Sequence, residues 1–215
     1  MTARIRSRPV LMDPDSRLAR PVAGIDEAGR GPLAGPVVAA AVVAPDGWVL
    51  GGLDDSKKLS EAIRRELGTR IRSDPDVRWA VGWASAEEID ALNILQATFL
   101  AMRRALDGLG IFPASVAVDG NRCIPGVDIP QMAVVEGDGK ILSIAAASIL
   151  AKTARDGWMV QQDTLHPGYG FSIHKGYPTP GHLEALVRLG PSALHRRTFA
   201  PVRRCLERGL GGRIR

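Results

Sequence analysis

The chain of 215 residues has two cysteines and no apolar run long enough to cross a membrane. Cys123 and Cys205 form neither a metal-binding spacing nor a disulfide framework, which fits a reducing compartment. Arg4, Arg6 and Arg8 are not followed by the apolar core of a secretory signal. These absences favour a cytoplasmic protein without a membrane-spanning segment.

Two common phosphate-binding glycine motifs are also missing. The dinucleotide-binding fingerprint needs Gly-x-Gly-x-x-Gly at the start of a helix, whereas Gly31 is followed by Pro32, Pro36 and a strand-like run. No Gly-x-x-x-x-Gly-Lys-Ser/Thr segment occurs, so the sequence contains no P-loop.

Aromatic residues make up only 5% of the chain, so its core must be built from Ala, Val, Leu and Ile. The length and the 45% hydrophobic content indicate one ordinary globular domain with short appendages. A net charge of +5 and a pI of about 9.7 favour a polyanionic partner such as nucleic acid.

The most informative stretch is residues 22–43. An apolar run ends in Asp26 and Glu27, a turn rich in glycine follows, and residues 37–43 form a second apolar run, so the pattern predicts strand, turn and strand. Side chains alternate along a strand, so only one of the two carboxylates can point straight into a shared site. The pair is either solvated at the strand end or neutralised by a cation or metal, and hard divalent ions prefer such oxygen ligands.

Two later segments repeat this arrangement. A strand is predicted over residues 115–119 and ends in Asp119, and a brief strand over 133–135 is followed by Glu136, Gly137 and Asp138. If the strands of Asp26 and Asp119 lie side by side with aligned ends, the two carboxylates become neighbours. Three acidic strand ends therefore predict one acidic site.

Hydrophobic spacing and capping residues predict the remaining elements. They are a strand over 77–84 and helices over 60–72, 85–88 onward, 93–109, 143–162 and 181–188. The small residues 145–148 predict close packing of the long helix on the sheet. Lys152, Arg155 and Asp156 fall on its polar positions, and Asp156 is expected to be an exposed carboxylate near Arg155.

The ends of the chain are basic. Residues 1–20 are interpreted as a flexible Arg-rich leader, residues 21–202 as the catalytic domain, and residues 203–215 as a basic tail. The segment 166–182 holds Tyr169, Tyr177 and three histidines; it is either a rigid surface loop or a platform where a ring stacks beside cations. His195, Arg196 and Arg197 add to the basic character of the C-terminus.

Six motifs, taken together and in order, resemble the bacterial ribonuclease HII family of type 2 ribonucleases H. The resemblance extends from about Val22 to about Val202. The motifs are GIDEAGRG at 24–31, DSKKLS at 55–60, VDGN at 118–121, GD at 137–138, AASILAK at 146–152 and HKGYP at 174–178.

The resemblance implies an α/β protein with the ribonuclease H-like fold, a mixed central sheet flanked by helices, and extra C-terminal helices. It implies an endoribonuclease that cuts the RNA strand of RNA–DNA hybrids and cuts 5′ of single ribonucleotides in duplex DNA, leaving 3′-hydroxyl and 5′-phosphate ends. The expected cofactor is a pair of Mn²⁺ or Mg²⁺ ions. The expected partners are RNA–DNA hybrid and ribonucleotide-containing duplex DNA, bound by a monomer in the cytoplasm.

The resemblance also assigns site residues. The catalytic and metal-binding carboxylates would be Asp26, Glu27, Asp119 and Asp138. The substrate would be bound by Gly29, Arg30 and Gly31 at the ribose 2′-hydroxyl, by Tyr177 stacking on the neighbouring sugar, and by Lys57, Ser148 and Lys152 at the backbone.

One position departs from the pattern of bacterial relatives, which often have a basic residue where this chain has Glu136. Its negative charge would weaken the attraction for phosphate locally. Two other functions stay open from the residues: a DNA-processing nuclease of the same fold, and a nucleic-acid binder without catalysis. Acidic strand ends argue against the binder, because carboxylates repel phosphates unless a cation lies between them.

Overall fold

The computed structural model describes residues 18–52 and 59–211, with side chains described up to residue 208. A five-stranded sheet in the order β3-β2-β1-β4-β5 forms the centre. Its strands are β1 Val22–Ala28, β2 Val37–Val43, β3 Arg78–Ala84, β4 Ser115–Asp119 and β5 Gln131–Val134. Strand β2 is antiparallel to β1 and β3, whereas β1, β4 and β5 are parallel. The predicted strand, turn and strand over 22–43 is confirmed as the β1–β2 hairpin.

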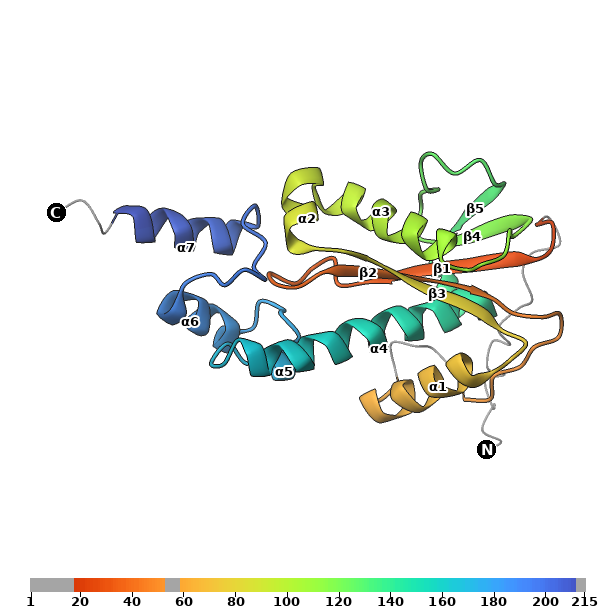
Figure 1. Ribbon diagram of the computed structural model, residues 1–215, viewed down its shortest axis with the longest axis horizontal. Coiled ribbons are helices and arrows are strands. Elements are labelled where there is room, and N and C mark those ends of the chain that lie inside the picture. The colour runs from red at the N-terminus through yellow and green to blue at the C-terminus, as the bar shows by residue number, and fades with distance from the viewer. Residues whose placement is uncertain (1–17, 53–58, 212–215) are drawn as a thin grey trace, which may run out of the picture.

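Helices cover both faces of this sheet (Figure 1). One face carries α2 (Ala86–Leu92) and α3 (Ile94–Asp107); the other carries α4 (Leu142–Leu165), against which α1 (Glu61–Ser73) packs. Three further helices, α5 (Phe171–His174), α6 (Pro180–Leu189) and α7 (Ala200–Gly211), lie beyond the end of the sheet where the β1–β2 hairpin turns. The predicted mixed sheet, flanking helices and extra C-terminal helices are confirmed.

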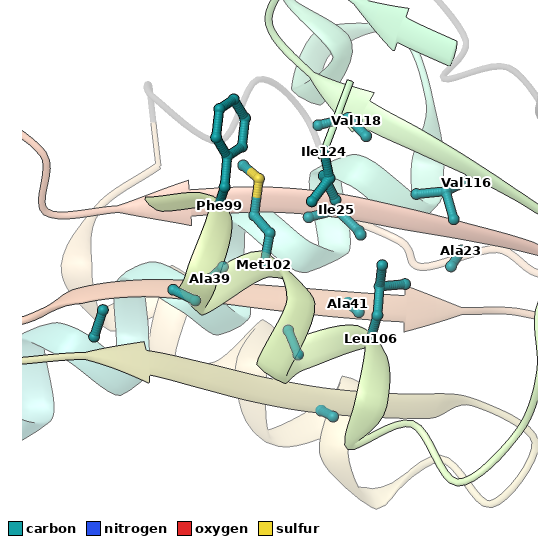
Figure 2. Close-up of a cluster of buried hydrophobic side chains, with 14 of the residues drawn as sticks. Ala23, Ile25, Ala39, Ala41, Phe99, Met102, Leu106, Val116, Val118 and Ile124 are labelled. Carbon is teal, nitrogen blue, oxygen red and sulfur yellow. The ribbon is translucent and has the colours of Figure 1, made fainter. Parts of the chain in front are cut away.

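Small residues let the helices approach the sheet closely, as expected from a core poor in aromatic rings. An ideal Cβ on Gly24 of β1 would overlap the backbone of Ser143 and Ile144 at the start of α4, and one on Gly82 of β3 would overlap the backbone of α3. Figure 2 shows the α3 side of the sheet, where Phe99 and Met102 of α3 belong to one buried cluster with alanines and β-branched residues of the strands. The position of α4 against β1 is what carries its polar residues to the acidic strand ends.

The predicted helix starts are confirmed by their caps. The Ser60 hydroxyl accepts from the amide of Ile63, Ser85 and Glu88 form a reciprocal capping box, and the Asn93 side chain caps α3. Each cap provides a hydrogen-bond partner for an amide that a helix start otherwise leaves without one.

The expectation for Asp156 is wrong. Asp156 is buried, and its carboxylate pairs with Lys152 at 3.0 Å, one turn earlier on α4. Arg155 is not on a polar surface either; its side chain is fully buried against the segment 34–36. The Arg155 side chain is covered by the hairpin segment 34–36 and by the loop at Lys175, which periodicity along the helix cannot reveal.

The outer parts of the domain division are only partly described. The leader 1–20 lies outside the described residues except for 18–20, and the boundary at residue 203 falls within α7. Among the helices described, none combines the length and apolar character needed to cross a bilayer.

Candidate active site

The acidic strand ends meet because β1 and β4 are parallel neighbours. Their register pairs Gly24 with Ala117 and Ile25 with Val118, so Asp26 and Asp119 follow at the same level of the sheet. The two carboxylates are close enough for each other's charge to matter, since Asp119 raises the pKa of Asp26. Asp26 and Asp119 are therefore neighbours, as the sequence predicted.

Asp26 is buried, with only 6% of its surface exposed. Burial raises its pKa well above the ordinary value, and the charges of Glu27 and Asp119 raise it further. Opposing this, the Ser148 hydroxyl and the Glu27 amide, the latter at 2.7 Å, donate hydrogen bonds to the carboxylate. A buried carboxylate among like charges is a strong ligand for a cation.

Glu27 is the carboxylate that, by the alternation of side chains along a strand, does not point straight into the site. Burial raises its pKa, while the guanidinium of Arg30, 3.2 Å away, lowers it. Asp119 again acts in the raising direction. Asp26 is therefore directed inward, and Glu27 lies at the rim and is held by the arginine of the glycine turn.

Asp138 approaches the same group from a third segment. It is 5% exposed and lies in the short 3-10 helix Gly137–Gly139, directly after β5. The amide of Gly137 donates to Oδ1 of Asp119 at 2.7 Å, which ties this helix to the end of β4. Glu136 is exposed and takes no part in this hydrogen bond; its backbone is left-handed, with φ 55°.

The acids are gathered but not drawn tightly together. Within residues 18–52 and 59–211, no three His, Cys, Asp or Glu side chains stand close enough to hold a metal ion in their present rotamers. Asp26, Glu27 and Asp119 nonetheless act on one another electrostatically. Divalent-cation binding would relieve that repulsion, so the donor set fits a hard metal ion.

The glycine turn lies beside these acids. Gly29 has φ 94°, and an ideal Cβ there would overlap the Arg155 side chain, so this position requires glycine. Gly31 is different: a Cβ would be 3.7 Å from the Tyr177 ring, an ordinary contact. The Arg30 side chain is half exposed. The turn and Tyr177 thus form one surface next to Asp26 and Glu27.

Of the two tyrosines in the segment 166–182, only Tyr177 is available at the surface, with 39% exposed. The Lys152 ammonium lies 5.6 Å from its ring centroid and the Arg155 guanidinium lies 5.9 Å from it. Tyr169 is instead buried, stacked on Phe171 at 5.2 Å, and bonded to the carbonyl of Gly190. Of these two tyrosines, Tyr177 is therefore the one whose ring lies beside cations.

Two of the histidines, His182 and His195, form a buried hydrogen-bonded pair. The amide of Ser192 donates to Nδ1 of His195, so Nε2 of His195 carries the proton that points to Nε2 of His182 at 3.1 Å. Nδ1 of His182 then donates to the carbonyl of Tyr177 at 2.9 Å. Both histidines are buried, and burial lowers the pKa of His195 to about 3. This series of hydrogen bonds between neutral imidazoles holds the backbone carbonyl of Tyr177 from the interior of the protein.

Two arginines next to the site were not predicted from the sequence to belong to it. Arg155 and Arg196 are both fully buried, and both bind backbone carbonyls of the glycine turn and its continuation. Arg196 is therefore not part of a basic surface at the C-terminus. Lys57, predicted to contact phosphate, lies outside the described residues.

Comparison with known proteins agrees with this geometry. The family model described as ribonuclease HII matches residues 23–202. The chain is 56% identical to a ribonuclease HII of Laribacter hongkongensis over 191 residues, covering 88% of this chain and 96% of that protein. It is 59% identical to one of Rhizorhabdus wittichii over 182 residues, covering 85% and 89%.

Solved structures show the same fold. The crystal structure of ribonuclease H2 from Pyrococcus horikoshii is 28% identical, with a TM-score of 0.72 over 87% of this chain and 97% of that one. A ribonuclease HIII described as Bst-RNase HIII, in complex with Mn²⁺, has a TM-score of 0.70 at 19% identity over 86% and 69%. The predicted ribonuclease H-like fold is confirmed.

Proposed function

The chain belongs to the ribonuclease HII family, and from this premise we propose how its residues carry out the reaction. The protein is an endoribonuclease that cleaves RNA in RNA–DNA hybrids and at ribonucleotides embedded in duplex DNA. We propose further that it cuts 5′ of the ribonucleotide and leaves 3′-hydroxyl and 5′-phosphate ends, acting as a cytoplasmic monomer.

The observation that carries the assignment of the site is the group Asp26, Glu27 and Asp119. Burial and mutual repulsion raise the pKa of Asp26 and of Glu27, and a cation between the carboxylates would reverse that penalty. We assign Asp138 as the fourth ligand because it is buried next to the residue that bonds Asp119.

A relative of the same fold was crystallised with Mn²⁺, which supports Mn²⁺ or Mg²⁺ as the ion used by this chain. When bound, two such ions polarise the phosphodiester and stabilise charge on the leaving 3′ oxygen. The four carboxylates hold the ions, and the Ser148 hydroxyl orients Asp26 for that role. Contact of Ser148 with the nucleic-acid backbone stays a proposal.

Discrimination of RNA from DNA requires contact with the 2′-hydroxyl, which both donates and accepts hydrogen bonds. The backbone at Gly29, Arg30 and Gly31 is suited to this contact, because glycine permits close approach and the turn adjoins the carboxylates. The exposed ring of Tyr177, next to Gly31, would stack on the neighbouring sugar. Lys152 and Lys57 would contact phosphates without reading bases.

The test is cleavage of a DNA duplex that contains one ribonucleotide, with Mn²⁺ or Mg²⁺. Wild-type protein should cut it and Asp26→Asn should lose at least about 100-fold in kcat. Asp76→Asn, an exposed carboxylate in the turn before β3, is the matched control and should retain full activity. Equal rates for wild type and Asp26→Asn would contradict the assignment.

The DNA-processing alternative is separated by the substrate. An all-DNA duplex of the same sequence should remain uncut, and Arg30→Ala should impair cleavage at the ribonucleotide. A nuclease of the same fold that processes DNA would cut the all-DNA duplex and be indifferent to Arg30→Ala.

A further inference from the structure

We propose that Arg196 is a positioning residue for ribose recognition: its buried guanidinium fixes the turn 29–36 so that two backbone N–H groups face the substrate. Here this segment is called the recognition turn. The inference rests on the proposed role of Gly29, Arg30 and Gly31 at the 2′-hydroxyl. It adds a residue more than 160 positions away in the chain, which touches neither the substrate nor the carboxylates.

The side chain of Arg196 is fully buried and bonds only to backbone carbonyls among the described residues. Its Nη2 donates to Gly29 at 2.6 Å, and its Nη1 donates to Arg30 at 3.0 Å and to Pro32 at 2.7 Å. Its Nε donates to the carbonyl of Gly35 at 2.9 Å. One planar group thereby holds four carbonyls of the recognition turn at once.

The direction of the N–H groups follows from peptide geometry. A trans peptide is planar, so the N–H of one residue points opposite to the carbonyl of the residue before it. Because the carbonyls of Gly29 and Arg30 point to Arg196, the N–H groups of Arg30 and Gly31 point away from it. In the described part of the chain, neither N–H has a protein acceptor. Both are therefore available to a ligand oxygen.

The charge on Arg196 strengthens these donors. Burial and the nearby Arg155 lower its pKa to about 9, so the guanidinium is still protonated at neutral pH. A charge-assisted bond to a carbonyl polarises the whole peptide and makes the N–H on its other side a better donor. The charge of Asp90 acts on Arg196 from a distance, and no ion pair to a carboxylate is formed by Arg196 among the described residues.

Arg155 has a different task. It binds the carbonyls of Ala34 and Pro36 and, through Nη1, the carbonyl of Lys175 at 2.9 Å. It thus joins the far end of the recognition turn to the loop that carries Tyr177. It does not bind the carbonyls of Gly29 or Arg30, so the orientation of the two free N–H groups depends on Arg196.

Lysine cannot replace Arg196 in this role. Four carbonyls are held by donors fixed in one plane, whereas an ammonium is a point charge with three donors on a flexible stem. Arg196→Lys keeps the positive charge and loses the geometry. It is therefore the informative variant. Arg104→Lys is the matched control, since Arg104 lies on α3 and bonds to Glu88 and to the carbonyl of Trp83 in β3, away from residues 29–31.

The experiment compares binding of two duplexes that differ by one 2′-hydroxyl, by fluorescence anisotropy in buffer with EDTA so that nothing is cut. We expect wild type and Arg104→Lys to prefer the ribonucleotide duplex, and Arg196→Lys to lose this preference about 10-fold, with less than a 2-fold change in Kd for the all-DNA duplex. Circular dichroism establishes that each variant is folded at the assay temperature. A purely structural role would change the melting temperature and leave the ratio intact.

The outcomes separate the inference from the function beneath it. If wild type binds both duplexes equally, the proposed reading of the 2′-hydroxyl by residues 29–31 is wrong. If wild type discriminates and folded Arg196→Lys does so equally, the proposal for Arg196 is overturned. Should Arg196→Lys not fold, Phe199→Leu removes the ring 5.1 Å below the guanidinium; a 2- to 5-fold loss of the ratio supports the proposal and an unchanged ratio overturns it.

Discussion

Replacing Gly29 by alanine should destabilise the protein strongly, whereas the same change at Gly31 should not. At Gly29 the backbone is left-handed (φ 94°), which costs a residue with a Cβ about 1–2 kcal/mol. The new methyl would also overlap Nε and Cδ of Arg155 and lie 2.9 Å from the carbonyl oxygen of Pro36. Arg155 would have to move, and each of its carbonyl bonds is worth about 1.5–3 kcal/mol.

The sum for Gly29→Ala is a loss of about 2.5–5 kcal/mol if one such bond is broken. For a domain of this size that lowers the melting temperature by about 5–20 °C. Gly31→Ala has no strained φ and only a 3.7 Å contact to Tyr177, so its melting temperature should stay within about 3 °C of wild type.

Differential scanning calorimetry of both variants without metal measures these shifts. The comparison removes helix and strand propensity from the question, because both positions lie in one turn and both changes add one methyl group. Equal melting temperatures for the two variants would refute the packing of Arg155 against Gly29 and, with it, the account of why the turn has its shape.

Three further outcomes are expected. Asp26→Asn should stabilise the metal-free protein by about 1–2 kcal/mol at pH 7–8. The folded-state pKa of Asp26 is raised, so folding favours its protonated form, and the gain in stability should shrink as the pH falls through that pKa. A gain in stability that grows in acid would contradict this. The free energy of unfolding of the wild type should fall by about 2 kcal/mol between pH 7 and pH 5, because the pKa of His195 is lowered to about 3 in the folded protein. Urea titrations should show a smaller fall for His195→Asn, and equal falls for the two proteins would contradict this. Affinity for hybrid should fall by about tenfold or more between 50 and 200 mM salt, and a flat response would exclude tracking of phosphates.

The strands and the acidic ends could be predicted because their signals are local. Residues 22–43 alternate between apolar runs and a glycine turn, and a carboxylate at the end of a short apolar run is conspicuous at Asp26 and Asp119. Family resemblance then grouped them, and the parallel register of β1 and β4 brings them together.

The buried arginines could not be predicted in the same way. Arg155 reaches carbonyls 119 and 121 positions away, and Arg196 reaches carbonyls 161 to 167 positions away. Periodicity along α4 placed Arg155 and Asp156 on a polar face, and it holds no information on contacts with distant segments such as residues 34–36 or the loop at Lys175. A charged residue buried by a distant part of the chain has the same local signature as an exposed one.

The central claim is that acids from separate segments hold divalent ions beside a ribose. Anomalous diffraction from crystals of Asp138→Asn or wild-type protein, grown with Mn²⁺ and a duplex containing one ribonucleotide, tests it most directly. We expect manganese peaks bounded by Asp26, Glu27, Asp119 and Asp138 in wild type, with at least one weakened in the variant. Peaks on another face of the protein, or peaks unchanged by the variant, would contradict the account.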